Sequence, residues 1–237
     1  LRSAVIAAAG MALSLQGAAH AGGGATLTSS GRRALLIQGG AESGLLNPYQ
    51  AVGCAAGLPE PRVNAGIILA SSQLADEGAT GIAGGRYLVE PGAYRIGGLN
   101  LEGFGSPHDR MGGRRFGNAT IWRWSQGGLN FAHVGATAGP ISGADQVLLG
   151  RPDVLILGVG GGSKIFDGDE AAALVNQLNP KRVIPVQYVI GEPPEGCDQG
   201  GVQPFLDAMA GTTVRKVGRS ISLPGQLDDS TVVTVMN

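Results

Sequence analysis

Short apolar segments separated by glycine-bearing turns follow one another along most of this chain, which has 42 glycines among its 237 residues. Two pairs of these segments flank a Gly-Gly step, at residues 94–101 and 119–133, and this spacing predicts tight β-hairpins. A third hairpin is expected over residues 25–37, around a Ser-Ser-Gly turn. The first half of the chain is therefore expected to be mainly antiparallel β-structure.

The second half alternates strands with helices. Val154–Leu157 and Val183–Val186 are apolar runs of strand length, and residues 169–178 between them show an alanine-rich helical pattern. Asp167 or Asp169 can cap this helix at its start, and an Asn-Pro step ends it. Hairpins followed by strand–helix–strand alternation predict an α/β fold, an αββα-type sandwich of two mixed β-sheets flanked by helices. Further strands are expected at residues 65–70, 87–89 and 230–235, and a further helix at residues 202–209.

Residues 1–21 form an export-signal-like or membrane-anchor segment. A basic residue, an apolar run at residues 4–15 and an Ala-His-Ala sequence ending at Ala21 are the parts of an export signal. The run is shorter than the roughly 20 apolar residues that cross a membrane easily. In the alternative interpretation, residues 11–15 form the first strand of the core. No repeat or linker divides the remainder, so a single domain is expected over residues 22–237.

The charge of the chain argues against a nucleic-acid partner. The formal net charge is −1 and charged residues make up 15% of the chain. There is no basic excess to neutralise a phosphate backbone. Two local pairs of basic residues, Arg32-Arg33 and Arg114-Arg115, are interpreted as solvated loop or hairpin charges.

The two cysteines, Cys54 and Cys197, lie in separate segments rich in glycine and proline. Neither their spacing nor their neighbours indicate a metal-binding knuckle. Two interpretations remain open: a disulfide that joins the two segments, or two unrelated thiols. An oxidising compartment would favour the disulfide.

Six short segments follow one another along the chain. They are Leu69–Glu77 (LASSQLADE), Pro91–Tyr94 (PGAY), Ser106–Asp109 (SPHD), His133–Ala136 (HVGA), Gly158–Gly162 (GVGGG) and Pro185–Tyr188 (PVQY). Their order resembles the metallo-β-lactamase fold, in the branch of L-ascorbate-6-phosphate lactonase-like hydrolases. In that branch a His-x-His-x-Asp-His loop, a Pro-Gly-Glu-Tyr turn and four further motifs occur in the same order.

The resemblance implies a degenerate metal site. Hydrolases of this family hold two zinc ions, which need nitrogen and carboxylate ligands and an open position for water. Among the ligand positions carried over to this chain, only Asp76 and His108 keep the family's residue type. Leu74 and Ala136 have no donor atom, and Ala136 stands where the family has a carboxylate that bridges the metals. The full set of vestigial positions is Ser72, Leu74, Asp76, Glu77, His108, Ala136 and Gln187.

The number of histidines points the same way without any alignment. The chain has three, His20, His108 and His133, fewer than a dinuclear site of this family normally uses. We therefore expect no metal cofactor and no catalytic residues. In that case His108 is expected to be a hydrogen-bonded loop histidine, and Gln187 to hydrogen-bond where a ligand once stood. Asp76 and Glu77, the two acids that come after Ser72, are expected to cap a helix.

Other catalytic motifs are weaker. The glycine cluster at residues 158–162 lacks the Lys-Ser/Thr ending of a phosphate-binding loop and predicts a tight turn. There is no Gly-x-Ser-x-Gly sequence, and neither cysteine has a histidine nearby. Trp122 and Trp124 are two residues apart on an expected strand, so they share one face and are expected in the core.

Three functional hypotheses follow. The first is a catalytically inactive protein that binds a protein partner, with membrane contact through residues 1–21. The export signal resembles the thylakoid type, which suggests an assembly or repair factor on the lumenal side of a photosynthetic complex such as photosystem II; a bacterial periplasm is the alternative compartment. The second is a hydrolase with a remodelled single-metal site at Asp76, Glu77 and His108. The third is a small-ligand sensor that uses the vacated cleft.

Overall fold

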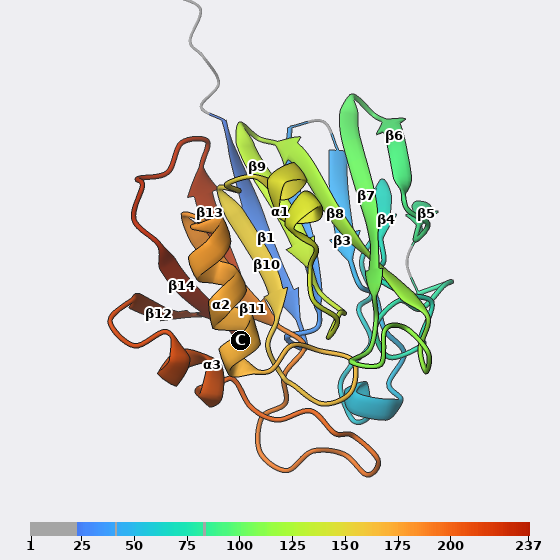
Figure 1. The fold of residues 1–237 in the computed structure, drawn as a ribbon. Coiled ribbons are helices and arrows are strands. Elements are labelled where there is room, and N and C mark those ends of the chain that lie inside the picture. Colours follow the sequence, from blue (N-terminus) through green and yellow to red (C-terminus); the bar gives the residue numbers. More distant parts are fainter. Residues whose placement is uncertain (1–22, 41, 83) are drawn as a thin grey trace, which may run out of the picture.

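The computed structural model describes residues 23–40, 42–82 and 84–237 and contains two mixed β-sheets packed face to face (Figure 1). This arrangement confirms the predicted sandwich. The smaller sheet has the strand order β13-β1-β2-β3-β4-β5, and the larger has the order β12-β14-β11-β10-β9-β8-β7-β6. Each sheet combines an antiparallel part with a parallel part.

The strands of the smaller sheet are β1 (Gly24–Ser30), β2 (Ala34–Gly39), β3 (Glu42–Leu46), β4 (Ile67–Leu69), β5 (Arg86–Leu88) and β13 (Ser220–Pro224). The strands of the larger sheet are β6 (Gly92–Ile96), β7 (Leu99–Pro107), β8 (Asn118–Gln126), β9 (Leu129–Val134), β10 (Val154–Gly158), β11 (Arg182–Val186), β12 (Thr213–Val217) and β14 (Val232–Met236). The helices are η1, a 3₁₀ helix (Gly53–Ala55), α1 (Gly143–Leu149), α2 (Gly168–Leu178) and α3 (Gln203–Ala208).

The main core lies between the two sheets. Leu27, Ile37 and other alternate residues of the hairpin β1–β2 meet the inner face of the larger sheet there. Trp122 and Trp124 both belong to this core, as their spacing predicted, and the ring of Trp124 stacks on Phe131 with centroids 5.1 Å apart. Burial of these apolar faces is the main force that holds the sheets together.

A second core lies on the outer face of the larger sheet. The helices α1, α2 and α3 lie on this side of the sandwich (Figure 1), and α2 buries Ala171, Leu174 and Leu178 in this core. The parallel strands β10 and β11 are therefore buried on both faces, which explains their uninterrupted apolar sequences. As predicted, α2 begins at an aspartate cap, Asp167, and ends at Asn179.

A loop covers the outer face of the smaller sheet. Residues 47–65, which include η1, place Tyr49 and Ala55 against Leu45 and Ile68 of that sheet. The hydroxyl of Tyr49 donates a hydrogen bond to the carbonyl of Pro59 at 2.8 Å, which closes the loop on itself. In the described residues the α-helices thus flank the larger sheet, and this loop takes the place of a helical layer on the other side.

Two local predictions are wrong. No helix begins after Asp76 and Glu77, because residues 75–77 form a turn that directs both carboxylates into the protein. Arg33 is not a solvated charge: its side chain is 1% exposed. Gly31 and Arg32 both have a φ of 59°. After this left-handed turn the side chain of Arg33 lies inside the protein.

The predictions for residues 1–21, an export signal, a membrane anchor or a first core strand, lie outside the described residues, as does His20. Within the described ranges, none of the helices is both long and apolar enough to cross a membrane.

Candidate functional site

The vestigial positions follow the carboxyl ends of four strands. Ser72, Leu74, Asp76 and Glu77 follow β4, and the other three positions, His108, Ala136 and Gln187, follow β7, β9 and β11. Ligand sites in α/β folds are commonly built from the loops at this edge of a sheet. Side-chain contacts join the group after β4 to His108.

Glu77 is the centre of these contacts. Its side chain is fully buried, and Oε1 lies 2.7 Å from His108 Nε2 and accepts a hydrogen bond of 2.9 Å from the Ser72 hydroxyl. Oε2 lies 3.5 Å from Lys164 Nζ. Burial by itself would raise the pKa of Glu77, but the close approach of His108 and the charge of Lys164 outweigh it and hold the pKa below its ordinary value. Glu77 is therefore a buried carboxylate that is ionised at neutral pH.

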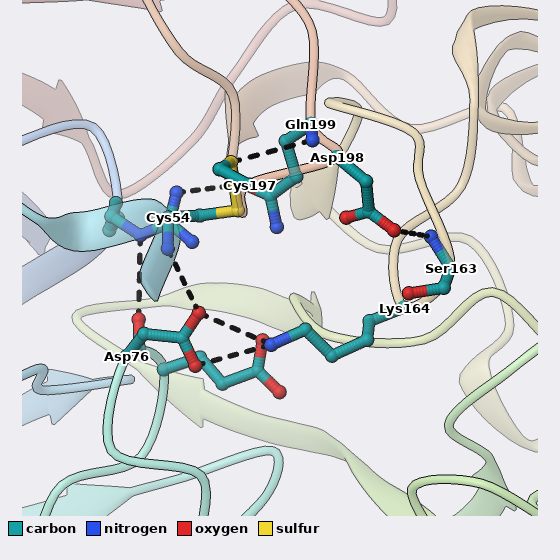
Figure 2. The surroundings of a disulfide bond; sticks show 9 residues. Cys54, Asp76, Ser163, Lys164, Cys197, Asp198 and Gln199 are labelled. Carbon is teal, nitrogen blue, oxygen red and sulfur yellow. Dashed lines mark hydrogen bonds and ion pairs between the residues drawn. A yellow bond between two sulfur atoms is a disulfide. The ribbon is translucent and has the colours of Figure 1, made fainter. Parts of the chain in front are cut away.

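Asp76 is paired with the same lysine. Lys164 extends from the loop after β10, and its Nζ lies 3.2 Å from each carboxylate oxygen of Asp76 (Figure 2). The backbone N–H of Cys54 also approaches Asp76, at 3.4 Å from Oδ2. Lys164 thus places one ammonium group between two neighbouring carboxylates.

Arg33 supplies a second buried cation. Its Nη1 donates to Gln199 Oε1 at 2.8 Å, and its Nε donates to the backbone carbonyl of Asp76 at 3.4 Å. Burial lowers the pKa of Arg33, while the charges of Asp76 and Glu77 raise it. Because a guanidinium keeps its proton in proteins, Arg33 remains a cation.

These residues form a balanced buried network, named here the charge network: Arg33, Asp76, Glu77, His108 and Lys164. Two carboxylates face a lysine and an arginine, and buried charges persist only where they are paired in this way. Sequence reasoning identified the acids and His108 but missed Arg33, Lys164 and Gln199. No motif marks these three, since Lys164 is 88 residues from Asp76 and Gln199 is 166 residues from Arg33.

Of the remaining vestigial positions, Ser72 contacts the charge network through Glu77, and the other three, Leu74, Ala136 and Gln187, take no part in it. Ala136 is a buried core residue, and Leu74 is half-buried at the edge of a cavity. Gln187 is fully buried with a φ of 56°, but its side-chain amide makes no hydrogen bond to the described residues, contrary to the prediction. The other buried histidine, His133, lies 3.3 Å from the hydroxyl of Ser71, and burial lowers its pKa to about 3.

A cavity of about 310 Å³ opens beside the charge network. Apolar and charged groups share its wall, and Lys164 Nζ lies 5.6 Å from the centroid of the Phe116 ring. The wall includes Val52, Leu74, Asp76, Phe116, Lys164 and Asp198.

Cys54 and Cys197 form a disulfide, which decides between the two interpretations left open by the sequence. The bond joins η1 to the loop after β11, at the side of the charge network (Figure 2). The residues next to Cys197 continue the contacts: Asp198 accepts a hydrogen bond of 2.8 Å from the backbone of Ser163, and Gln199 binds Arg33.

Comparison with known proteins agrees with this fold. A family model described as the beta-lactamase superfamily domain matches residues 26–187. A Thermotoga maritima protein assigned to the Zn-dependent hydrolases of the metallo-beta-lactamase superfamily has a TM-score of 0.70 and 22% identity, over 90% of this chain and 100% of its own. Igni18, a metallo hydrolase from Ignicoccus hospitalis, has a TM-score of 0.59 and 14% identity, over 86% and 100%.

An isothiocyanate hydrolase from Delia radicum gut bacteria has a TM-score of 0.60 and 11% identity, over 88% of this chain and 95% of its own. No curated protein sequence matches the chain at a significant level. At these identities the solved structures establish the fold alone. The family model covers well over half of the chain, and the chain therefore belongs to the metallo-β-lactamase superfamily.

Proposed function

We propose that this chain is a catalytically inactive metallo-β-lactamase-like protein that acts by binding another protein. The observation that carries the proposal is the position of Lys164 Nζ, 3.2 Å from both oxygens of Asp76 and 3.5 Å from Glu77 Oε2. An ammonium group in that place binds the carboxylate oxygens of Asp76 and Glu77 that a metal ion would need as ligands.

The donor set supports the same proposal. A zinc ion requires about four nitrogen, sulfur or oxygen ligands. Leu74 and Ala136 offer none, Ser72 donates its hydroxyl proton to Glu77, and Glu77 is shared by His108 and Lys164. The residues at these positions do not fit a dinuclear zinc site. Lys164 and Arg33 lie close to the two carboxylates, Asp76 and Glu77, and balance their charge without a metal ion.

Apolar side chains on the surrounding loops support a binding role. Val52 is 46% exposed, Met111 58% and Ile190 65%, and each lies on a loop rather than in a strand or helix. Val52 also lines the cavity beside the charge network. Residues that bind partners lie on loops more often than on the strands and helices that the loops connect. The loops at residues 47–61, 108–117 and 187–201, which carry these three side chains, are the proposed contact region.

The compartment and partner are proposed from the sequence. An export-signal-like segment at residues 1–21 of thylakoid type suggests the thylakoid lumen, with photosystem II as the membrane complex that is assembled or repaired and with membrane contact through the same segment. The disulfide is consistent with an oxidising compartment. A bacterial periplasm would supply the same chemistry and is the alternative compartment.

Two measurements test the proposal. Calorimetric titration with Zn²⁺ should detect no site with a Kd tighter than about 1 μM, and purification from native membranes should recover the same membrane complex in repeated preparations. Stoichiometric tight zinc binding would contradict the inactive centre. Recovery of no membrane complex would contradict the proposed partner.

The second candidate is a hydrolase with a remodelled single-metal site at Asp76, Glu77 and His108. The cavity that opens at Asp76 favours it, because a substrate could reach that carboxylate. Hydrolysis of a lactone, ester or phosphoester that is lost in His108→Ala with the fold intact would support it. Activity that His108→Ala leaves unchanged would eliminate this site as its source.

A further inference from the structure

The loop that carries Cys197 is held to the protein at few points. Its two ends are joined by a hydrogen bond from the backbone of Val189 to the carbonyl of Gly200 at 2.9 Å, and Gly200 is bonded to Gly160 at 2.6 Å. Between these anchors, residues 190–196 are mostly exposed. Within the described residues, their one hydrogen bond is inside the loop, from Cys197 N–H to the carbonyl of Pro194.

The remaining contacts of the loop belong to three consecutive residues at its end, directly before Gly200. Cys197 is bonded to Cys54, Asp198 accepts the N–H of Ser163, and Gln199 accepts from Arg33. Ser163 directly precedes Lys164. The charge network has two cations, Arg33 and Lys164. The loop contacts Arg33 directly, and it contacts Ser163, the residue next to Lys164.

The partner cysteine is connected to the same network from the other side. The backbone N–H of Cys54 lies 3.4 Å from Asp76 Oδ2, and a Cβ atom at Gly53 would stand 3.0 Å from that oxygen. The disulfide thus links the segment that contacts the acids to the segment that contacts the cations (Figure 2).

The two cysteines differ in exposure. Cys54 is 5% exposed, whereas Cys197 is partly exposed and is flanked by the exposed residues Gly196 and Asp198. We therefore expect a thiolate from solution to attack at Cys197. Disulfide exchange depends on such access to one sulfur.

From these contacts we propose that the Cys54–Cys197 disulfide is a reversible redox clasp, opened at Cys197 by a protein dithiol, and that its opening releases residues 190–199 from the charge network. The attacking thiolate bonds to Cys197 Sγ while the bond to Cys54 breaks, and Cys54 leaves as a thiolate. The second thiol of the reductant then displaces Cys197. Two electrons and two protons pass to the protein, and the reductant becomes a disulfide.

The fold is expected to survive this reaction. Neither cysteine belongs to the core between the sheets or to the core beneath the helices. Reduction would change the loop and the charge network, not the sandwich. The inference goes beyond the proposed function and does not depend on it, since the clasp would operate equally in an inactive protein and in a hydrolase.

Limited proteolysis of the full chain tests the release of the loop. Of the two glutamates in the loop, Glu192 precedes a proline and resists a Glu-specific protease, which leaves Glu195–Gly196 as the sensitive bond. After treatment with thioredoxin and a dithiol, under conditions that preserve the circular dichroism spectrum, cleavage at this bond is expected to accelerate at least tenfold. Equal rates in the oxidised and reduced proteins would overturn the proposal.

Hydrogen exchange tests the link to the charge network. The amides of Cys54 and Ser163, which are bonded to Asp76 and Asp198, should exchange at least tenfold faster after reduction, while amides of β10 and β11 stay unchanged. A Cys54→Ser/Cys197→Ser variant should have the exchange rates of the reduced protein, and the dithiol should not change them. If the thiols become reactive only in denaturant, or if Cys54 and Ser163 exchange equally in both states, the clasp is purely structural and the proposal fails.

Discussion

At the scale of single residues, Lys164 best shows what could and could not be predicted. The acids Asp76 and Glu77 and the imidazole of His108 were identified because they stand in motifs whose order can be compared with a family. Lys164 and Arg33 have no such motif, and they reach the site only because the fold brings distant loops together. The comparison of motifs predicted that metal ligands are missing, whereas the two buried cations become visible only in three dimensions.

Replacing Lys164 with methionine should destabilise the protein, because it leaves Asp76 and Glu77 buried without their shared cation. Removing one partner of a buried ion pair costs about 3 kcal/mol of unfolding free energy. Urea denaturation monitored by circular dichroism measures this loss of unfolding free energy. Arg123→Met, which breaks the half-exposed pair with Glu102, is the matched control and should cost less than about 1 kcal/mol. Equal losses in the two variants would mean that the charge network contributes no special stability.

A pH series tests the buried state of His133. Burial lowers its folded-state pKa to about 3 from an ordinary value of 6.5. Between these values the unfolded chain binds a proton that the folded protein does not, so the unfolding free energy falls as the pH falls below 6.5. The slope from this group is at most about 1.4 kcal/mol per pH unit.

His133→Gln should remove that part of the slope between pH 6 and pH 5, when the urea midpoints of the variant and the wild type are compared across the range. If both proteins lose stability in parallel over this interval, then His133 titrates normally in the folded state.

At the scale of elements, the predictions succeeded where periodicity and turn chemistry agree. The hairpins β6–β7 and β8–β9 form around the Gly-Gly turns that predicted them, and α2 has both a cap and an apolar face. The structure also contains elements that were not predicted, α1, β3, β12 and β13. Leu149 is the one buried residue of α1, and β12 is almost entirely exposed, so neither has the apolar pattern on which such predictions depend.

The start of α2 offers a test at this scale. The Asp167 side chain accepts a hydrogen bond from the backbone of Glu170 at 2.9 Å, and the Glu170 side chain accepts one from the backbone of Asp167. Asp167→Ala should therefore cost about 1 kcal/mol of unfolding free energy. Asp169 lies two residues after Asp167 and makes no capping bond, so Asp169→Ala should cost only about a few tenths of a kcal/mol. A loss from Asp169→Ala as large as that from Asp167→Ala would show that charge at the helix start, and not the cap, is responsible.

At the scale of the whole molecule, two cores stabilise the sandwich, and the disulfide joins loops at one end of it. The sequence predicted the two-sheet architecture because hairpins and strand–helix–strand units leave few ways to bury their apolar faces. It left the pairing of the cysteines open, because the 143 residues between Cys54 and Cys197 carry no sign of their distance in space.

Removal of the disulfide should lower the stability of the whole molecule. A cross-link over 143 residues restricts the unfolded chain, and loop-closure entropy sets an upper limit of about 5 kcal/mol on the loss. Denaturation of Cys54→Ser/Cys197→Ser in urea, next to the oxidised wild type, gives the value. A variant as stable as the wild type would show that the loops are constrained in the unfolded state by other means.

We propose that Lys164 and Arg33 provide the positive charge that metal ions provide in metal-dependent members of this superfamily. Elemental mass spectrometry of protein purified from its native source, without chelators, decides whether they do. We expect no stoichiometric zinc, manganese or iron. One or two metal ions per chain would contradict it, because Asp76 and Glu77 could not then be bound as the structure has them.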